Sequence, residues 1–329
     1  MINLNKIKGA NILITGGLGF IGSNLAIKLA NLGCKMTILD SLDKNCGGNI
    51  YNINDIKGSV KFEITDIAKN KQLHTFVSGK DIIFNLAGQV SHTQSLTDPY
   101  SDLNNNLSAH LALLEACRKA NPQAAIIYSG SRSQYGRASN LPVKENHIME
   151  PMDINGVNKL GAEMYHLLYS YLHGMNTCSL RLANIYGPRH QMKSPDGFIN
   201  WFVRKAIDNS AIKIFGKGEP LRDALYVEDA VDAIISISLT KNFRGKAYNV
   251  ASGKPISVGK IAEEIIRICG NGKIEFAEYP KDFEKVEIGD FYADINRIKK
   301  DTGWEPKTGF PEGIKQTIEF YNKNKKHYW

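Results

Sequence analysis

The chain has 329 residues, of which 43% are hydrophobic and 22% are charged, and its formal net charge is +8. These values are typical of globular proteins and exclude disorder, collagen-like repeats and coiled coil as the main architecture. The length allows about two domains, or one large α/β unit with an appended lobe.

The basic residues are scattered, with no basic stripe interleaved with aromatic residues, so we expect no nucleic-acid partner. No stretch approaches the roughly 18 apolar residues of a membrane span, and the N-terminus lacks a signal-peptide layout. We therefore expect a cytoplasmic protein with no membrane partner. The five cysteines lie far apart without a Cys/His cluster, and predict neither a disulfide framework nor a metal site.

The first half of the chain alternates short apolar runs with longer stretches of helical periodicity. Strands are expected at 11–15, 35–39, 61–64, 81–86, 125–128 and 177–180, and helices at 20–32, 107–120 and 157–171. This alternation indicates βαβ units. The predicted fold class is therefore α/β, with a Rossmann-type doubly wound parallel sheet.

Beyond about residue 180, proline and glycine become denser and the alternation weakens. Helices are still expected at 200–208, 228–238 and 258–269. We expect the doubly wound domain to span 1–180, with a return segment around 221–252, and a smaller C-terminal α/β lobe to span 181–329.

A glycine motif joins the first strand to the first helix. Gly16, Gly19 and Gly22 form GxxGxxG, and glycine there permits a tight turn, close approach of backbone to a pyrophosphate, and tight packing of helix on strand. The helix N-terminus adds unpaired N–H groups and the positive end of its dipole. Asp40, at the end of the second strand, would accept hydrogen bonds from ribose hydroxyls and repel a 2′-phosphate. The sequence therefore predicts NAD, not NADP, bound to the first domain.

The glycine spacing and several further segments resemble the extended short-chain dehydrogenase/reductase family of nucleotide-sugar epimerases, dehydratases and dehydrogenases. The resemblance covers nearly the whole chain. It rests on Asp66-Ile67, Asn85–Gly88, Asn106, Tyr128–Ser131, Tyr135-Gly136, 181–189 and 222–229. The NAD contacts that it implies, beyond the three glycines and Asp40, are Phe20, Ile21, Asp66, Ile67, Leu86, Ala87, Gly88, Asn106 and Lys159.

In this family a tyrosine and a lysine four residues later share one face of a helix. The tyrosine takes the proton of a sugar hydroxyl, and the lysine binds the nicotinamide ribose and lowers the pKa of the tyrosine. Lys159 matches the lysine, and Ser131 matches the serine that binds the same hydroxyl. The tyrosine position holds Asn155, whose amide cannot take a proton at physiological pH. The implied catalytic residues are Ser131, Asn155 and Lys159, with Asn155 expected to orient the hydroxyl while another group receives its proton.

Three interpretations stay open. An active redox enzyme could pass the proton to Ser131, water, Lys159 or a nearby ring such as His92 or Tyr186. A slow or single-step enzyme could oxidise or reduce its sugar without completing an epimerase cycle. The chain could also be a non-catalytic NAD- or nucleotide-sugar-binding protein, although its intact cofactor and diphosphate motifs argue against this.

The resemblance also bears on the substrate. Related dehydratases carry Asp-Glu after the serine, whereas this chain has Arg132 and Ser133, so we expect no water elimination. Asn184 and Arg222 are expected at the substrate diphosphate, because an arginine fork fits phosphate oxygens. His92 lies on a loop that borders the sugar in related proteins, and Arg132 is a further candidate for contact with the substrate.

Taken together, the resemblance implies NAD-dependent redox chemistry at a sugar hydroxyl of a nucleotide sugar, with C4 favoured. The chain would be an epimerase or a dehydrogenase, for example a GDP-heptose-type C4 dehydrogenase, in surface-polysaccharide precursor synthesis. The helices around 107–120 and 157–171 resemble the pair that forms the dimer interface of the family. We therefore expect a homodimer or a dimer of dimers.

Overall fold

The computed structural model describes residues 3–44, 46–193, 195, 197–279 and 287–329. Its largest element is a seven-stranded parallel sheet with the order β10-β6-β5-β4-β1-β2-β3. The strands are β1 (Asn11–Thr15), β2 (Lys35–Asp40), β3 (Lys61–Ile64), β4 (Ile82–Asn85), β5 (Ala125–Ser131), β6 (Asn176–Leu182) and β10 (Ala247–Val250). The expected α/β class with a Rossmann-type doubly wound sheet is confirmed. The order reverses between β1 and β4, which opens a crevice at the carboxyl ends of these strands.

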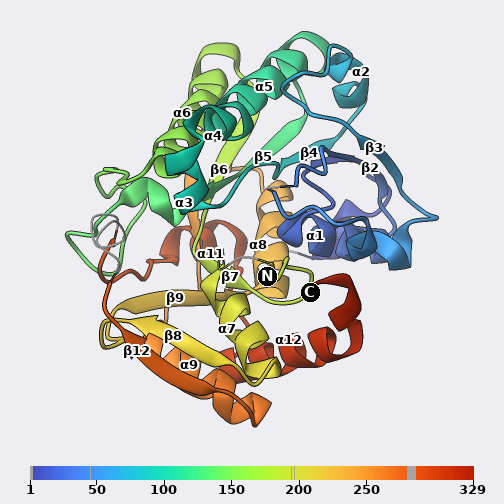
Figure 1. Cartoon of the computed structure of the whole chain (residues 1–329). Coiled ribbons are helices and arrows are strands. Elements are labelled where there is room, and N and C mark those ends of the chain that lie inside the picture. The colour runs from blue at the N-terminus through green and yellow to red at the C-terminus, as the bar shows by residue number, and fades with distance from the viewer. Residues whose placement is uncertain (1–2, 45, 194, 196, 280–286) are drawn as a thin grey trace.

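Helices cover both faces of the sheet (Figure 1). One face carries α1 (Phe20–Asn31) and α8 (Val227–Ser238), and the other carries α5 (Ala109–Ala120) and α6 (Ile154–His173). Side chains of β1 alternate between these layers, because Ile12 and Ile14 pack with the first pair of helices and Leu13 packs with α5. The strands are apolar on both sides for this reason.

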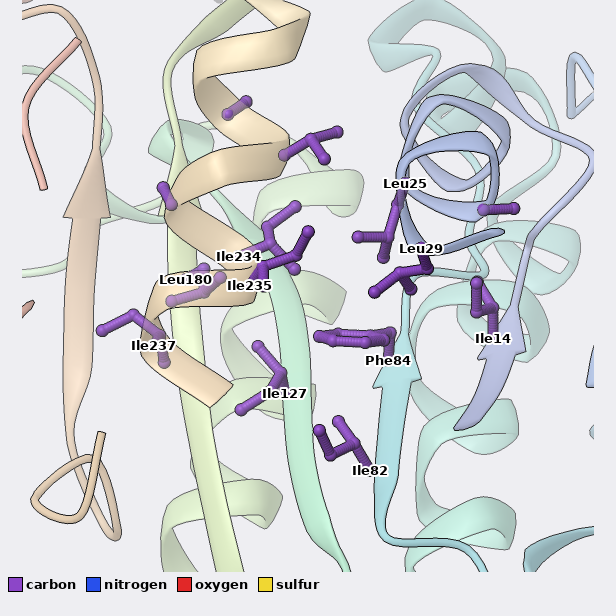
Figure 2. Close-up of a cluster of buried hydrophobic side chains, with 14 of the residues drawn as sticks. Ile14, Leu25, Leu29, Ile82, Phe84, Ile127, Leu180, Ile234, Ile235 and Ile237 are labelled. Carbon is purple, nitrogen blue, oxygen red and sulfur yellow. The ribbon is translucent and has the colours of Figure 1, made fainter. Parts of the chain in front are cut away.

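Figure 2 shows the first of these cores. Leucines of α1 and isoleucines of α8 converge on side chains from four neighbouring strands. The labelled residues of this core are Leu25, Leu29, Ile234, Ile235, Ile237, Ile14, Ile82, Phe84, Ile127 and Leu180. The helix α8 follows the sequence boundary expected near residue 180, so the first layer draws on both halves of the chain. The limits of the two domains remain predictions.

The remaining elements form a smaller lobe below the carboxyl ends of the main sheet in Figure 1. Three strands pair as β11-β9-β7 and two as β12-β8. These are β7 (Asn184–Tyr186), β8 (Ala211–Phe215), β9 (Leu221–Tyr226), β11 (Pro255–Ser257) and β12 (Lys273–Ala277). They pack with α7 (Phe198–Ile207), α9 (Val258–Cys269) and α12 (Phe310–Asn324) around a second apolar core.

Most predicted boundaries lie within three residues of those observed. The helix α6, expected over 157–171, begins three residues earlier because the Asp153 side chain accepts a hydrogen bond from the Gly156 N–H and caps the helix. Short elements between the main ones escaped prediction, because they span too few residues to show a period. These are α2 (Leu73–Val77), α3 (His92–Thr97), α4 (Pro99–Leu103), α11 (Asn296–Thr302), the π-helical turn Asn104–Ser108 and several 3-10 turns, including η4 (Arg132–Tyr135). None of the helices in the described ranges has the length and apolarity of a membrane span.

Candidate active site

A pocket opens at the carboxyl ends of the central strands, beside the crossover between β1 and β4. Its lining comes from the segments that follow β1, β2, β3, β4 and β5, from α6, and from residues between Leu182 and Gly197. The predicted site residues that line it are Gly16, Gly19, Phe20, Ile21, Gly22, Asp40, Asp66, Ile67, Leu86, Ala87, Gly88, His92, Ser131, Arg132, Asn155, Lys159 and Asn184. Asn106 and Arg222 lie outside this lining.

The glycine turn has the shape that a pyrophosphate requires. Gly16 adopts φ +69°, and a Cβ there would approach the Ala87 backbone at 2.8 Å. A Cβ at Gly22 would overlap the Gly16 carbonyl oxygen, so a side chain at 22 would push α1 away from the turn, and one at 16 would push the turn away from the end of β4. No side chain caps the first turn of α1 at Gly19, which leaves its N–H groups for a ligand. The residues present therefore fit a dinucleotide.

Asp40 is held firmly at the end of β2. Its Oδ2 accepts a hydrogen bond from the Leu18 N–H and its Oδ1 accepts one from the Leu42 N–H, each at 2.9 Å. Burial raises the pKa of Asp40 and outweighs these two hydrogen bonds, which act in the opposite direction. Asp40 lines the pocket, which is compatible with a contact to the ribose. This role stays a prediction.

Lys159 lines the pocket from the second turn of α6. Burial lowers its pKa to about 8, although Asp102 and Cys46 act to raise it. A Cβ at Gly88 would lie 2.6 Å from Lys159 Nζ and 2.7 Å from Asn106 Oδ1. Glycine at 88, with φ +151°, therefore gives the ammonium group room beside the end of β4.

Asn155 lines the same pocket, but its amide nitrogen points away from it. Asn155 Nδ2 donates to Asp102 Oδ2 at 3.0 Å and lies 3.1 Å from both Gln89 O and Gln89 Oε1. A carboxylate and a carbonyl only accept hydrogen bonds, which fixes the nitrogen at this end. Only Oδ1 is left to meet a substrate hydroxyl, as an acceptor. The orienting role of Asn155 stays a prediction, now limited to this one atom.

Asp102 is a residue that the sequence did not single out. It is 1% exposed, and it accepts hydrogen bonds from the side-chain amides of Asn106 at 3.0 Å, Asn155 at 3.0 Å and Asn158 at 2.8 Å. Its charge also favours the protonated form of Lys159. The only advance signal was the spacing of Asp102 and Asn106, which places them on one helical face.

Asn106 links Asp102 to the loop after β4 through hydrogen bonds. Its Oδ1 accepts a hydrogen bond from the Gln89 N–H, and its Nδ2 donates to Gln89 O. The side chain is fully buried. Asn106 therefore holds the loop after β4, and a direct contact with NAD stays a prediction.

Ser131 ends β5 with its hydroxyl at the pocket. Its Oγ accepts hydrogen bonds from the Ser133 N–H at 3.1 Å and the Ser133 hydroxyl at 3.0 Å. Gln134 Oε1 accepts from the Ser131 N–H and completes a capping box for η4. Because the N–H and the hydroxyl of Ser133 both donate to Ser131 Oγ, the hydroxyl proton of Ser131 is free to be donated to a substrate oxygen.

His92 and Asp153 form a close pair at the edge of the pocket. His92 Nδ1 lies 2.6 Å from Asp153 Oδ2, although the two residues are 61 positions apart. Arg132 is charged and close to Asp153. Burial and Arg222 lower the pKa of Arg132 to about 10, while Glu287 and Asp153 act to raise it.

The two residues expected at the diphosphate differ in their surroundings. Asn184 begins β7, and its Oδ1 is buried without a hydrogen bond from any described residue, as expected of a side chain that awaits a ligand. Arg222 instead pairs with Glu287 at 2.6 Å and donates to Gly289 O. A diphosphate would have to compete with Glu287 for this guanidinium group, so its expected role stays a prediction.

Tyr186 lies in the second core. It is 1% exposed, its hydroxyl donates to Phe310 O at 3.3 Å, and it is not among the residues that line the pocket. Residues of the lining that the sequence reasoning missed include Cys46, His190 and Gln191, which belong to loops, and Asn105, which belongs to the π-helical turn. Burial raises the pKa of Cys46 to about 12, helped by Asp43 and Asp40, so its thiol is not a nucleophile at neutral pH.

Comparison with known proteins agrees with this geometry. Residues 12–251 match the model of the NAD dependent epimerase/dehydratase family. The chain belongs to this family. A UDP-glucose 4-epimerase of Mycolicibacterium smegmatis is 30% identical over 315 residues, which cover 94% of this chain and 97% of that protein.

Solved structures in the same family superimpose closely. A Thermotoga maritima UDP-glucose 4-epimerase with UDP-glucose matches at TM-score 0.88 and 28% identity, covering 95% of this chain and 99% of that one. A Thermus thermophilus UDP-glucose 4-epimerase complex with NAD matches at TM-score 0.84 and 25% identity, with 95% and 99% covered. The chain is thus a member of a family of NAD-dependent nucleotide-sugar enzymes, and NAD is its cofactor.

Proposed function

We propose that the protein is an NAD-dependent redox enzyme that acts on a hydroxyl group of a nucleotide sugar, at C4, as an epimerase or a dehydrogenase. The observation that carries the proposal is one pocket in which the glycine turn, Ser131, Lys159 and Asn184 meet. The epimerase relatives and the family match support a nucleotide sugar as the substrate class.

NAD, when bound, supplies the hydride acceptor of such a reaction. The residues that would hold it are those of the glycine turn, Asp40, Asp66 and Lys159. Lys159 would bind the nicotinamide ribose and place a positive charge beside the reacting oxygen. Ser131 would donate a hydrogen bond to this oxygen, and Asn155 Oδ1 would accept a hydrogen bond from a hydroxyl group of the sugar. Asn184 would contact the diphosphate.

Water elimination is not part of the proposal. Elimination needs a carboxyl acid or base beside the serine, whereas η4 begins with Arg132 and Ser133. Ser133 is buried and donates to Ser131, so it supports the serine. The chemistry that remains is oxidation, reduction or epimerisation, of which the GDP-heptose-type C4 dehydrogenase is one form.

A non-catalytic NAD- or nucleotide-sugar-binding protein is the second candidate. The observation in its favour is Asn155, which stands where the family has its catalytic tyrosine. Its amide nitrogen donates hydrogen bonds to Asp102 and Gln89. Turnover separates the two candidates, since binding is expected of both.

The cellular setting and assembly complete the proposal. We place the enzyme in the cytoplasm, in surface-polysaccharide precursor synthesis. We also propose a homodimer or dimer of dimers, because α6 exposes a row of apolar side chains. Their exposed fractions are 53% for Met164, 44% for Leu168, 84% for Tyr171 and 58% for Leu172. A monomeric mass by light scattering at micromolar concentration would contradict this assembly.

The test of function mixes purified protein and NAD with a panel of UDP-, GDP-, CDP- and dTDP-sugars. A rise of NADH absorbance with one sugar would identify the substrate and a net dehydrogenase. A product epimer without NADH accumulation would identify an epimerase that restores its cofactor. Tight binding of a sugar without either signal would favour the non-catalytic candidate.

A further inference from the structure

The proposed reaction needs a proton acceptor that Asn155 cannot supply, and the pair His92–Asp153 lies in the position to provide one. We propose that His92 Nε2 receives the proton of the sugar hydroxyl, and that Asp153 positions the His92 ring and balances the charge it acquires. This inference rests on the proposed function and deepens it by naming the general base.

The pair is fixed by its own hydrogen bonds. Asp153 Oδ2 lies 2.6 Å from His92 Nδ1, and Asp153 Oδ1 accepts from the Gly156 N–H at 2.7 Å. A carboxylate can only accept, so Nδ1 carries a proton, and in the neutral ring the lone pair is then on Nε2. The second oxygen is occupied by the cap of α6, which prevents the carboxylate from turning away. A carboxylate that orients an imidazole in this way is the arrangement by which serine hydrolases select the basic tautomer.

The pair also lies beside the residues proposed to bind the reacting hydroxyl. His92 begins α3 and lines the pocket with Ser131, Asn155 and Lys159. Its side chain is 45% exposed, whereas that of Asp153 is 10% exposed. The ring is therefore accessible from the pocket while its partner is sheltered. Asp153 stands two residues before Asn155, so the pair adjoins the position that holds the tyrosine in the family.

The electrostatic setting supports an ionised Asp153. Burial acts to raise the pKa of Asp153, but the hydrogen bonds of His92 and the Gly156 N–H and the charge of Arg132 act to lower it, and the pKa is lowered. Other charged groups of the packed elements include Asp102 on α4, its N-cap Asp98, and Lys159 and Glu163 on α6. Asp102 is occupied by three side-chain amides, and Asp98 caps α4 at the surface.

The step balances without a further reagent. The O–H bond of the sugar hydroxyl breaks, its proton forms the N–H bond at His92 Nε2, and the oxygen electron pair forms the C=O bond. The hydrogen on the same carbon leaves with its electron pair, and the oxidant is NAD. The imidazolium formed is paired with the Asp153 carboxylate, and it returns the proton when the carbonyl is reduced.

The test compares His92→Gln and Asp153→Asn with matched controls in the full chain. Gln keeps a donor for Asp153 but cannot take the proton, and Asn keeps an acceptor for the cap of α6. The controls are His74→Gln, an exposed histidine on α2, and Asp98→Asn, the cap of α4. The readouts are kcat, the pH profile of kcat/KM, the NAD dissociation constant, and the ¹⁵N shifts of the His92 ring.

If the inference is correct, His92→Gln lowers kcat roughly 10²- to 10⁴-fold with NAD affinity unchanged. It also removes the limb of the pH profile in which activity rises as the base loses its proton. Asp153→Asn lowers kcat by at least about tenfold and displaces that limb. The ¹⁵N shifts show a protonated Nδ1 in the parental protein, and the two controls retain parental values.

If the parental protein turns over and kcat of His92→Gln stays within about threefold of the parental kcat, the inference is overturned and the proposed function is unaffected. If Lys159→Met removes the acidic limb of the kcat/KM profile while His92→Gln leaves that limb unchanged, Lys159 receives the proton. This result also overturns the inference. A parental protein without turnover on any sugar overturns the proposed function. The ¹⁵N shifts still decide the pair in that case, because a ring protonated at Nε2 would show that no base faces the pocket.

Discussion

The amide nitrogen of Asn155 lies 3.0 Å from Oδ2 of Asp102, a carboxylate that is 1% exposed. The residue at the position of the family tyrosine is thus part of the support under the pocket. Its Oδ1 alone remains for a substrate. Asp102 accepts a hydrogen bond from Asn155 and also favours the protonated form of Lys159. This shared partner determines several of the effects that we expect of substitutions.

Asn155→Ala is expected to lower both stability and turnover. The substitution removes one of three amides that donate hydrogen bonds to Asp102, which leaves part of a buried carboxylate unsatisfied and costs about 1–3 kcal/mol. Urea unfolding measures this cost, and Asn140→Ala, at an exposed position, is the control that should change little. If Asn155→Ala turns over at the parental rate, Asn155 does not orient the sugar hydroxyl.

Activity is expected to fall as pH rises through about 8. Burial lowers the pKa of Lys159 to about this value, although Asp102 and Cys46 act to raise it, so the ammonium group loses its proton in this range. Asp102→Asn removes the favourable charge and should move the fall in activity to lower pH. The pH profile of kcat/KM for the parent, Asp102→Asn and the control Asp98→Asn gives the answer. If the alkaline limb does not move in Asp102→Asn, the loss of activity at high pH does not arise from Lys159.

Gly88→Ala is expected to weaken NAD binding by at least about tenfold, because its Cβ would lie 2.6 Å from Lys159 Nζ and force the ammonium group to move. The backbone at φ +151° adds strain for any side chain. Titration calorimetry with NAD measures the loss. Gly58→Ala, where a Cβ would meet nothing within 4 Å, serves as the control, and equal affinity in the two variants would contradict the proposed placement of Lys159.

Glu163→Gln is expected to lower the free energy of unfolding by about 3–5 kcal/mol, since it leaves a buried arginine without its counter-charge. Arg181 Nη2 lies 2.5 Å from Glu163 Oε1, with side-chain exposures of 3% and 0%. Glu263→Gln, in an exposed pair, should cost less than about 1 kcal/mol. Chemical denaturation of the two variants at neutral pH compares these costs.

The same pair predicts a pH dependence of stability. Burial acts to raise the pKa of Glu163, but the hydrogen bond and charge of Arg181, with hydrogen bonds from Ser179 and Gln134, lower it below its ordinary value of 4.5. The carboxylate therefore stabilises the fold above pH 4.5, and this contribution is lost as pH falls through the lowered value. Glu163→Gln should unfold with a weaker acid dependence than the parent, and parallel profiles would contradict this.

The sequence by itself determined the fold class and the NAD crevice. The glycine motif and Asp40 are recognised from their spacing, and Ser131 and Lys159 from the resemblance to the family. The parallel sheet then brings the carboxyl ends of the strands to one edge. Local spacing survives folding, which explains why these residues line the pocket as expected.

Only the tertiary structure decided which side chains pair across that edge. His92 meets Asp153 over 61 residues of sequence, Asn155 meets Asp102 over 53, and Arg222 meets Glu287 over 65. These contacts depend on how α3, α4 and α6 pack and on where the chain returns to the smaller lobe, and no periodicity records either. The sequence therefore showed that a tyrosine was missing, while the folded chain placed an imidazole and a carboxylate beside the position that lacks it.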